Sequence, residues 1–117
     1  MTIEIFIYSL YIICNLTMKS SLRHPYSRFF GTLANQVRID ILVLLLRGEK
    51  NVTGICSALH LKQPTASKNL LRLEECGFVK ARPNGKERHY SINRETISKV
   101  MTIMDSHMKK YCCRLKD

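Results

Sequence analysis

The chain has 117 residues, of which 45% are hydrophobic and 24% are charged, the composition of one compact domain. These values exclude a disordered chain, a collagen and a coiled-coil rod. The 19 Lys and Arg residues outnumber the 9 Asp and Glu residues, and the net charge of +10 favours a polyanionic partner, either nucleic acid or an acidic membrane surface.

Residues 1–17 differ from the rest of the chain, because they are mostly apolar and contain a single charged residue, Glu4. The apolar run is shorter than the roughly 20 residues of a membrane span. It also lacks the basic start and the small-residue cleavage site of a secretory signal. Three interpretations stay open: a first helix in a dimer interface, an upstream extension of a protein that starts at Met18, or a membrane contact, which is the least favoured.

Two helices are predicted next. The first covers residues 26–34, where Phe29, Phe30 and Leu33 are apolar at helical spacing. Asn35 can cap the second, over residues 36–47. Apolar residues lie on nearly every side of this second helix, so we expect it to be buried on most faces.

A helix-turn-helix is predicted for residues 51–77. Asn51 is the predicted cap of a helix over residues 52–59, and Pro64 suits the first turn of the next helix. That helix runs to about residue 76, and Gly77 ends it. Two helices joined by a turn of three to four residues are typical of this motif. The residues expected to face its interior are Leu70, Leu71 and Leu73.

A β-hairpin and a last helix complete the chain. Asn84-Gly85 lies between two short alternating runs in residues 78–92, a strong hairpin signal in which both turn residues are expected to have positive φ. Asn93 can cap the last helix, which is predicted from Arg94 to about Leu115. An apolar stripe with spacings of three and four predicts that this helix pairs with another: Ile97, Val100, Met101, Met104, Met108, Tyr111, Cys112 and Leu115.

The predicted fold is therefore mainly α with a small β-hairpin, in the order of a winged helix-turn-helix. Four blocks resemble the ArsR/SmtB family of metal-responsive repressors: LANQVRIDIL (33–42), LKQPTAS (61–67), LEECGFV (73–79) and NGKERHYS (84–91). The resemblance covers the chain from about Tyr26 to its end. It implies a homodimer that pairs through its first and last helices, binds a palindromic operator in double-stranded DNA and releases it when an inducer binds.

The resemblance also implies which residues contact DNA. The recognition helix begins at Gln63, and the wing is the basic hairpin. Short polar side chains at a helix N-terminus can reach base edges, while the helix end itself attracts phosphate. Lys62 departs from the family, which usually places a capping Ser there. The predicted DNA-binding residues are Lys62, Gln63, Thr65, Ser67, Lys68, Asn69, Arg72, Arg82, Lys86 and Arg88.

The two usual metal sites of the family are not expected in this chain. The thiolate site, E-L-C-V-C-D, aligns with residues 49–54, where Asn51 and Thr53 replace both cysteines. The site on the last helix, which begins D-x-H, aligns with Glu95-Thr-Ile97, without a histidine. We therefore predict no cofactor at either position.

Five cysteines remain to be explained, and their odd number and scattered positions argue against a disulfide framework or a zinc finger. Cys112 and Cys113, with Cys14 of a partner chain as a third sulfur, could bind a soft metal or metalloid ion. Alternatively these thiols are oxidised, or Cys112 packs in the apolar stripe and Cys113 is an exposed bystander.

No catalytic motif is present, so we expect a protein that is not an enzyme. The leading hypothesis is a cytoplasmic, dimeric, sequence-specific repressor. In it, residues 18–117 form the DNA-binding domain with a C-terminal dimerisation helix. The alternative is a winged-helix module for protein contacts or a non-specific DNA-binding protein.

Overall fold

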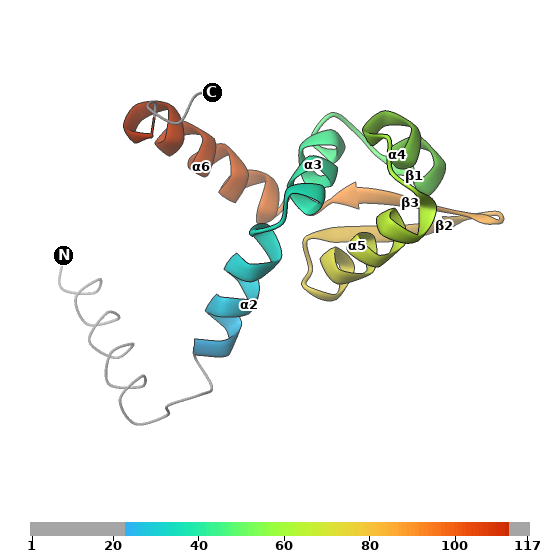
Figure 1. Cartoon of the computed structure of the whole chain (residues 1–117), viewed down its shortest axis with the longest axis horizontal. Helices are drawn as coiled ribbons and strands as arrows, with labels where there is room; N and C mark the ends of the chain where they lie inside the picture. Colours follow the sequence, from blue (N-terminus) through green and yellow to red (C-terminus); the bar gives the residue numbers. More distant parts are fainter. Residues whose placement is uncertain (1–22, 113–117) are drawn as a thin grey trace. The chain divides into compact units, whose positions relative to one another are not determined.

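The computed structural model describes residues 23–112, which contain five helices and a three-stranded antiparallel sheet (Figure 1). The three interpretations of residues 1–17 lie outside the described residues. The chain divides into two compact units, and the boundary lies between Asn35 and Gln36. In the first unit, α2 (Arg23–Leu33) begins three residues before the predicted start. The Thr32 hydroxyl donates to the Arg28 carbonyl oxygen at 2.6 Å, one helical turn earlier.

The second unit opens with α3 (Gln36–Leu45), which buries Ile41, Leu42 and Leu45 completely. The helix ends two residues before the predicted end. The Gly48 amide donates to the Leu45 carbonyl oxygen at 3.2 Å, and Gly48 has a φ of 151°. One side of α3 is open, since Val43 is 45% exposed.

The predicted helix-turn-helix consists of α4 (Val52–Leu59) and α5 (Gln63–Glu75). The Asn51 side chain accepts a hydrogen bond from the Gly54 amide at 2.8 Å, which confirms the predicted cap. Lys62, at the corresponding position of α5, makes no side-chain cap bond. His60 turns the chain in the left-handed conformation, with a φ of 55°.

The expectation that Leu71 faces inward was wrong. Leu70 and Leu73 are fully buried, but Leu71 is 55% exposed. Each residue advances about 100° around a helix, so Leu70 and Leu73 share one face and Leu71 falls beside it.

The sheet has the strand order β1-β3-β2, with β1 (Lys50–Asn51), β2 (Val79–Asn84) and β3 (Glu87–Ile92). The hairpin β2–β3 extends past α5 as the wing (Figure 1). The third strand, β1, was not predicted, because two residues carry no alternating pattern. Lys50 pairs with Tyr90, so β1 joins the wing to the start of α4.

The hairpin turn differs from the predicted one. Asn84 pairs with Glu87, which leaves Gly85 and Lys86 as the two turn residues. Gly85 has a φ of 66°, whereas the φ of Asn84 and Lys86 is negative. A type II′ turn needs a positive φ only at its first central residue, so Gly85 supplies it and the expectation for Asn84 was wrong.

The last helix, α6 (Ile97–Tyr111), begins three residues after the predicted start. The Asn93 side chain accepts from the Glu95 amide at 3.0 Å and from the Thr96 amide at 3.4 Å, so it closes a turn before the helix. Ile97 is buried, but Tyr111 is 63% exposed. Leu115, the last member of the predicted stripe, lies outside the described residues. Among residues 23–112, no helix is both long enough and apolar enough to cross a membrane.

Candidate nucleic-acid interface

The start of α5 presents a row of polar and basic side chains to solvent. Its inner face is anchored by Ala66, Leu70 and Leu73, which are fully buried. The opposite face carries five exposed residues: Lys62, Gln63, Thr65, Ser67 and Lys68. Within the described part of the chain, their side chains make no hydrogen bond or ion pair. Burial on one side and unpaired polar groups on the other leave this helix end available for a ligand.

Asn69 differs from these residues because its side chain is engaged within the protein. Arg38 Nε of α3 donates to Asn69 Oδ1 at 3.1 Å, and Asn69 Nδ2 donates to the Thr65 carbonyl oxygen at 2.9 Å. These two bonds tie α3 to the recognition helix and fix the orientation of the amide. A base contact by Asn69 stays a prediction, and it would require these bonds to break.

Arg38 was not predicted as part of this site. It is a basic residue within the otherwise mostly apolar segment of residues 36–47, and that contrast was the available signal. Arg72, predicted to share a face with Lys68, is half-buried, whereas Lys68 is exposed.

The wing carries Arg82, Lys86 and Arg88 on its surface, as expected. Both arginines are paired with carboxylates. Arg82 Nη2 lies 2.5 Å from Glu49 Oε1, and Arg88 Nη2 lies 3.2 Å from Glu74 Oε2. The hydrogen bond from Arg82 lowers the pKa of Glu49 and raises that of Arg82. A DNA phosphate that binds either arginine must therefore compete with a carboxylate.

A polar cluster joins the wing to the loop before α4. His89 Nδ1 lies 3.3 Å from Glu49 Oε1, and His89 Nε2 lies 3.5 Å from Glu87 Oε2. Asn51 Nδ2 donates to Glu87 Oε2 at 3.1 Å, while the other end of the same amide caps α4. Asn51 therefore couples the first helix of the motif to the wing.

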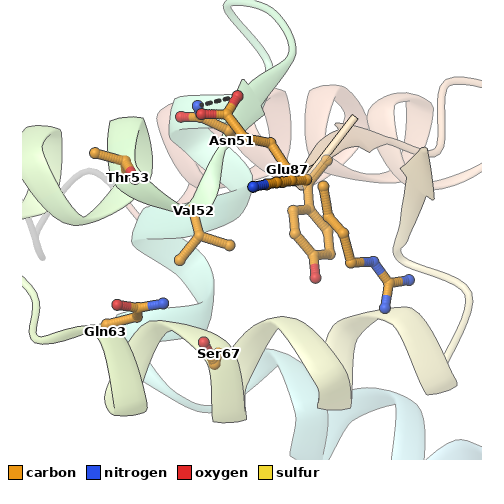
Figure 2. A pocket seen from close by; sticks show the side chains of 9 residues that line it. Asn51, Val52, Thr53, Gln63, Ser67 and Glu87 are labelled. Carbon is orange, nitrogen blue, oxygen red and sulfur yellow. Dashed lines mark hydrogen bonds between the residues drawn. The ribbon is translucent and has the colours of Figure 1, made fainter. Parts of the chain in front are cut away.

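Between these elements lies a pocket of about 290 Å³ (Figure 2). Figure 2 shows Gln63 and Ser67 on α5 facing Val52 at the start of α4, with Glu87 of the wing joined to Asn51. The remaining lining residues are Thr53, Lys86, Arg88 and Tyr90. The pocket thus opens where the helix-turn-helix meets the wing.

No group of three or more His, Cys, Asp or Glu residues suited to a metal ion is found among residues 23–112. Cys112 is half-buried at the end of α6, and Cys14 and Cys113 lie outside the described residues. The thiol site stays a prediction. Asn51 caps α4 at the first position where the resembling family has a ligand cysteine.

Exposed apolar side chains mark α2 and α6. Tyr26 and Phe30 of α2 are 54% and 58% exposed, and Ile103 and Met108 of α6 are 68% and 48% exposed. In a single chain these side chains have little apolar cover, and such surfaces are typical of association sites.

Known proteins that are similar to this chain agree with this geometry. Residues 35–81 match the family described as "Bacterial regulatory protein, arsR family". The chain is similar to the arsenical resistance operon repressor of Escherichia coli, with 34% identity over 67% of this chain and 68% of the relative. It is 35% identical to the HTH-type transcriptional regulator Rv0324 of Mycobacterium tuberculosis over 77% of this chain, but it spans only 42% of that protein.

Solved structures show the same fold. The homodimeric winged helix-turn-helix DNA-binding domain of Mb0332 from Mycobacterium bovis, a possible ArsR-family transcriptional regulator, superposes with a TM-score of 0.74 and 30% identity. The match covers 85% of this chain and 92% of that one. The predicted winged helix-turn-helix is therefore confirmed.

Proposed function

This chain belongs to the arsR family of bacterial regulatory proteins, and from this membership we propose that it is a homodimeric repressor that binds a palindromic operator in DNA. The observation that carries the proposal is the row of unpaired polar and basic side chains at the start of α5, from Lys62 to Lys68. Because the opposite face of the helix is buried, the row can enter a major groove without disturbing the core. A regulator of this kind acts on DNA in the cytoplasm and is not an enzyme.

Sequence specificity would come from the short polar side chains of the row. The Gln63 amide has both donors and an acceptor, and the Thr65 and Ser67 hydroxyls donate and accept, as base edges in the major groove require. Lys62 and Lys68 would contact phosphates, which position the helix without reading sequence. The wing would add Lys86, Arg82 and Arg88 along the neighbouring backbone or minor groove.

Dimerisation would cover the exposed apolar side chains of α6 and, as in the homodimeric M. bovis domain, bring two winged helix-turn-helix units together. Two recognition helices about 34–36 Å apart would then read successive major grooves, which accounts for a palindromic operator.

A binding assay decides between the proposal and its alternatives. A labelled duplex from the region upstream of the gene and a random duplex of equal length are titrated with protein at the same physiological salt concentration. A specific regulator prefers its site by a factor of about 10³ or more. Equal affinity for the two duplexes would indicate a non-specific DNA-binding protein. The absence of binding to either would favour a protein-contact module.

For the inducer, we propose that the chain does not use the family's usual metal positions, since Asn51 and Thr53 lack thiols. If a small effector acts through cysteine, it acts at Cys112 and Cys113, with Cys14 of the partner as a third sulfur. The test is the release of DNA by arsenite, cadmium or peroxide from the wild type and from the double variant Cys112→Ser, Cys113→Ser. An equal response of the two proteins would remove this thiol pair from the mechanism.

A further inference from the structure

The pocket between α4, α5 and the wing is lined by several polar side chains that the protein leaves unsatisfied. Within residues 23–112, no hydrogen bond or ion pair reaches the side chains of Thr53, Gln63, Ser67 or Lys86, all of which line it. They come from three separate elements and converge on one volume. Such convergence at a concave surface is typical of a binding site.

Tyr90 adds a buried group to this set. It is only 8% exposed, it lines the same pocket, and its hydroxyl has no hydrogen-bond partner in the described part of the chain. Arg88 lies over its ring, at 5.9 Å from the ring centroid, but that contact does not satisfy the hydroxyl. Polar atoms of largely buried residues are nearly always hydrogen-bonded to protein or to ordered water, so this hydroxyl is available to a group that enters the pocket.

The chemistry of the lining selects an acceptor. The Lys86 ammonium can only donate, and the Tyr90, Thr53 and Ser67 hydroxyls and the Gln63 amide can all donate as well. The one carboxylate of the lining, Glu87, already accepts from Asn51 at 3.1 Å and faces His89 at 3.5 Å. The guanidinium of Arg88 is held by Glu74 at 3.2 Å. The hydroxyls and the amide can accept as well as donate, but within the described residues the Lys86 ammonium has no carboxylate partner, so a negatively charged group with acceptor oxygens complements the lining.

The volume and the position of the pocket indicate which acceptor group it can hold. The volume of about 290 Å³ is roughly ten times the ~30 Å³ of a water molecule in the liquid, enough for a phosphate group. The pocket also lies between Gln63 and Ser67 of the recognition helix and Lys86 of the wing, so a duplex contacting both would pass its backbone over the opening.

We propose that this pocket binds one phosphate group of the DNA backbone, and that Tyr90 and Thr53, neither of which belongs to the predicted DNA-binding set, donate hydrogen bonds to it. The inference rests on the proposed DNA-binding function and deepens it. Phosphate contacts position a protein on DNA without reading sequence. The pocket therefore sets the register between the recognition helix and the wing.

The test uses Tyr90→Phe, which removes the hydroxyl and keeps the ring, with Ser106→Ala on the exposed surface of α6 as the hydroxyl-removal control. Loss of a hydrogen bond to a charged group is expected to weaken binding about 10-fold, on operator and random DNA alike. The free variant should unfold at the same or a higher urea concentration, because the hydroxyl has no partner in the described structure. If the hydroxyl had only a structural role, Tyr90→Phe would instead unfold at a lower urea concentration than the wild type.

A methylphosphonate scan locates the phosphate. Each phosphate of the operator is replaced in turn by a neutral methylphosphonate. One position in each half-site should weaken the wild type markedly and Tyr90→Phe much less, since that variant has already lost the contact. A second arm titrates inorganic phosphate into the free proteins and follows their backbone amide NMR signals. An NMR shift that Tyr90→Phe abolishes would show that free phosphate shares the pocket. The absence of such a shift, together with a methylphosphonate effect that depends on Tyr90, would assign the pocket to the DNA backbone alone.

The outcomes separate the two proposals. If the wild type binds its operator and Tyr90→Phe binds it equally well, the pocket assignment is overturned and the regulator function stands. If the wild type binds no DNA, the regulator function fails and the assignment of the pocket to a DNA phosphate fails with it, and the inorganic phosphate arm then tests only whether the pocket binds an anion. In that case, binding of inorganic phosphate that depends on Tyr90 would support the anion-binding chemistry of the pocket, and the absence of such binding would overturn that chemistry as well.

Discussion

Replacing Glu74 by Gln is expected to strengthen binding to DNA of any sequence, because the substitution removes the carboxylate that holds Arg88. In the free protein Arg88 Nη2 lies 3.2 Å from Glu74 Oε2, with side chains 57% and 32% exposed. A phosphate can bind this guanidinium only after the ion pair opens. An exposed pair of this kind is worth about 0.2–1 kcal/mol, so the substitution should raise the affinity roughly 1.4- to 5-fold for each protomer that contacts the DNA.

The assay is fluorescence anisotropy with a labelled operator and a labelled random duplex at one salt concentration. Four proteins form a double-mutant cycle: the wild type, Glu74→Gln, Arg88→Ala and the double variant. Glu75→Gln is the matched control, because it removes the same charge one residue away, and Glu75 has no ion pair within the described residues. Glu74→Gln should increase the affinity for DNA more than Glu75→Gln does, and only when Arg88 is present.

Two outcomes would contradict this account of Glu74. A gain of the same size in the Arg88→Ala background would show that Glu74 acts through its charge alone, without holding Arg88. A loss of affinity on Glu74→Gln would show that the carboxylate aligns Arg88 for the phosphate, so that the ion pair supports DNA binding.

Gln63→Ala should weaken binding to the operator by roughly 1–3 kcal/mol and leave random DNA unaffected, since Gln63 is predicted to contact bases; equal losses on both duplexes would count against base contact. Lys86→Ala should lower affinity for every sequence and reduce the slope of log K against log salt concentration by about one, and an unchanged slope would remove the wing from the DNA. Asn51→Ala should lower the free energy of unfolding in urea by about 0.5–2 kcal/mol, because α4 loses its cap; a stability equal to that of the wild type would contradict it. Met104→Asp should convert the dimer to a monomer in a sedimentation experiment, because the substitution buries an unpaired charge in the interface. A wild type that sediments as a monomer at micromolar concentration would contradict the proposed dimer itself.

Elements whose signals are local could be predicted from the sequence. Asn51 caps α4 through the amide of Gly54, three residues away, and Pro64 and the glycine at position 77 bound α5 through their own backbone preferences. The row from Lys62 to Lys68 could also be predicted, because an apolar face anchored by Leu70 and Leu73 leaves the polar residues outside. These features depend on atoms within one or two helical turns.

Contacts between residues far apart in the chain could not be predicted in this way, because they depend on how the elements pack. Strand β1 exists because Lys50 and Asn51 pair with β3, and two residues show no strand pattern alone. The Arg38–Asn69 and Arg82–Glu49 contacts join residues 31 and 33 positions apart. Such long-range partners determine whether a polar side chain is available to contact DNA or instead stabilises the protein. The pocket lined by Thr53, Ser67 and Tyr90 likewise forms only when distant elements pack together. Sequence periodicity reports which face of an element is apolar, but the partner of each polar atom is set by packing between elements.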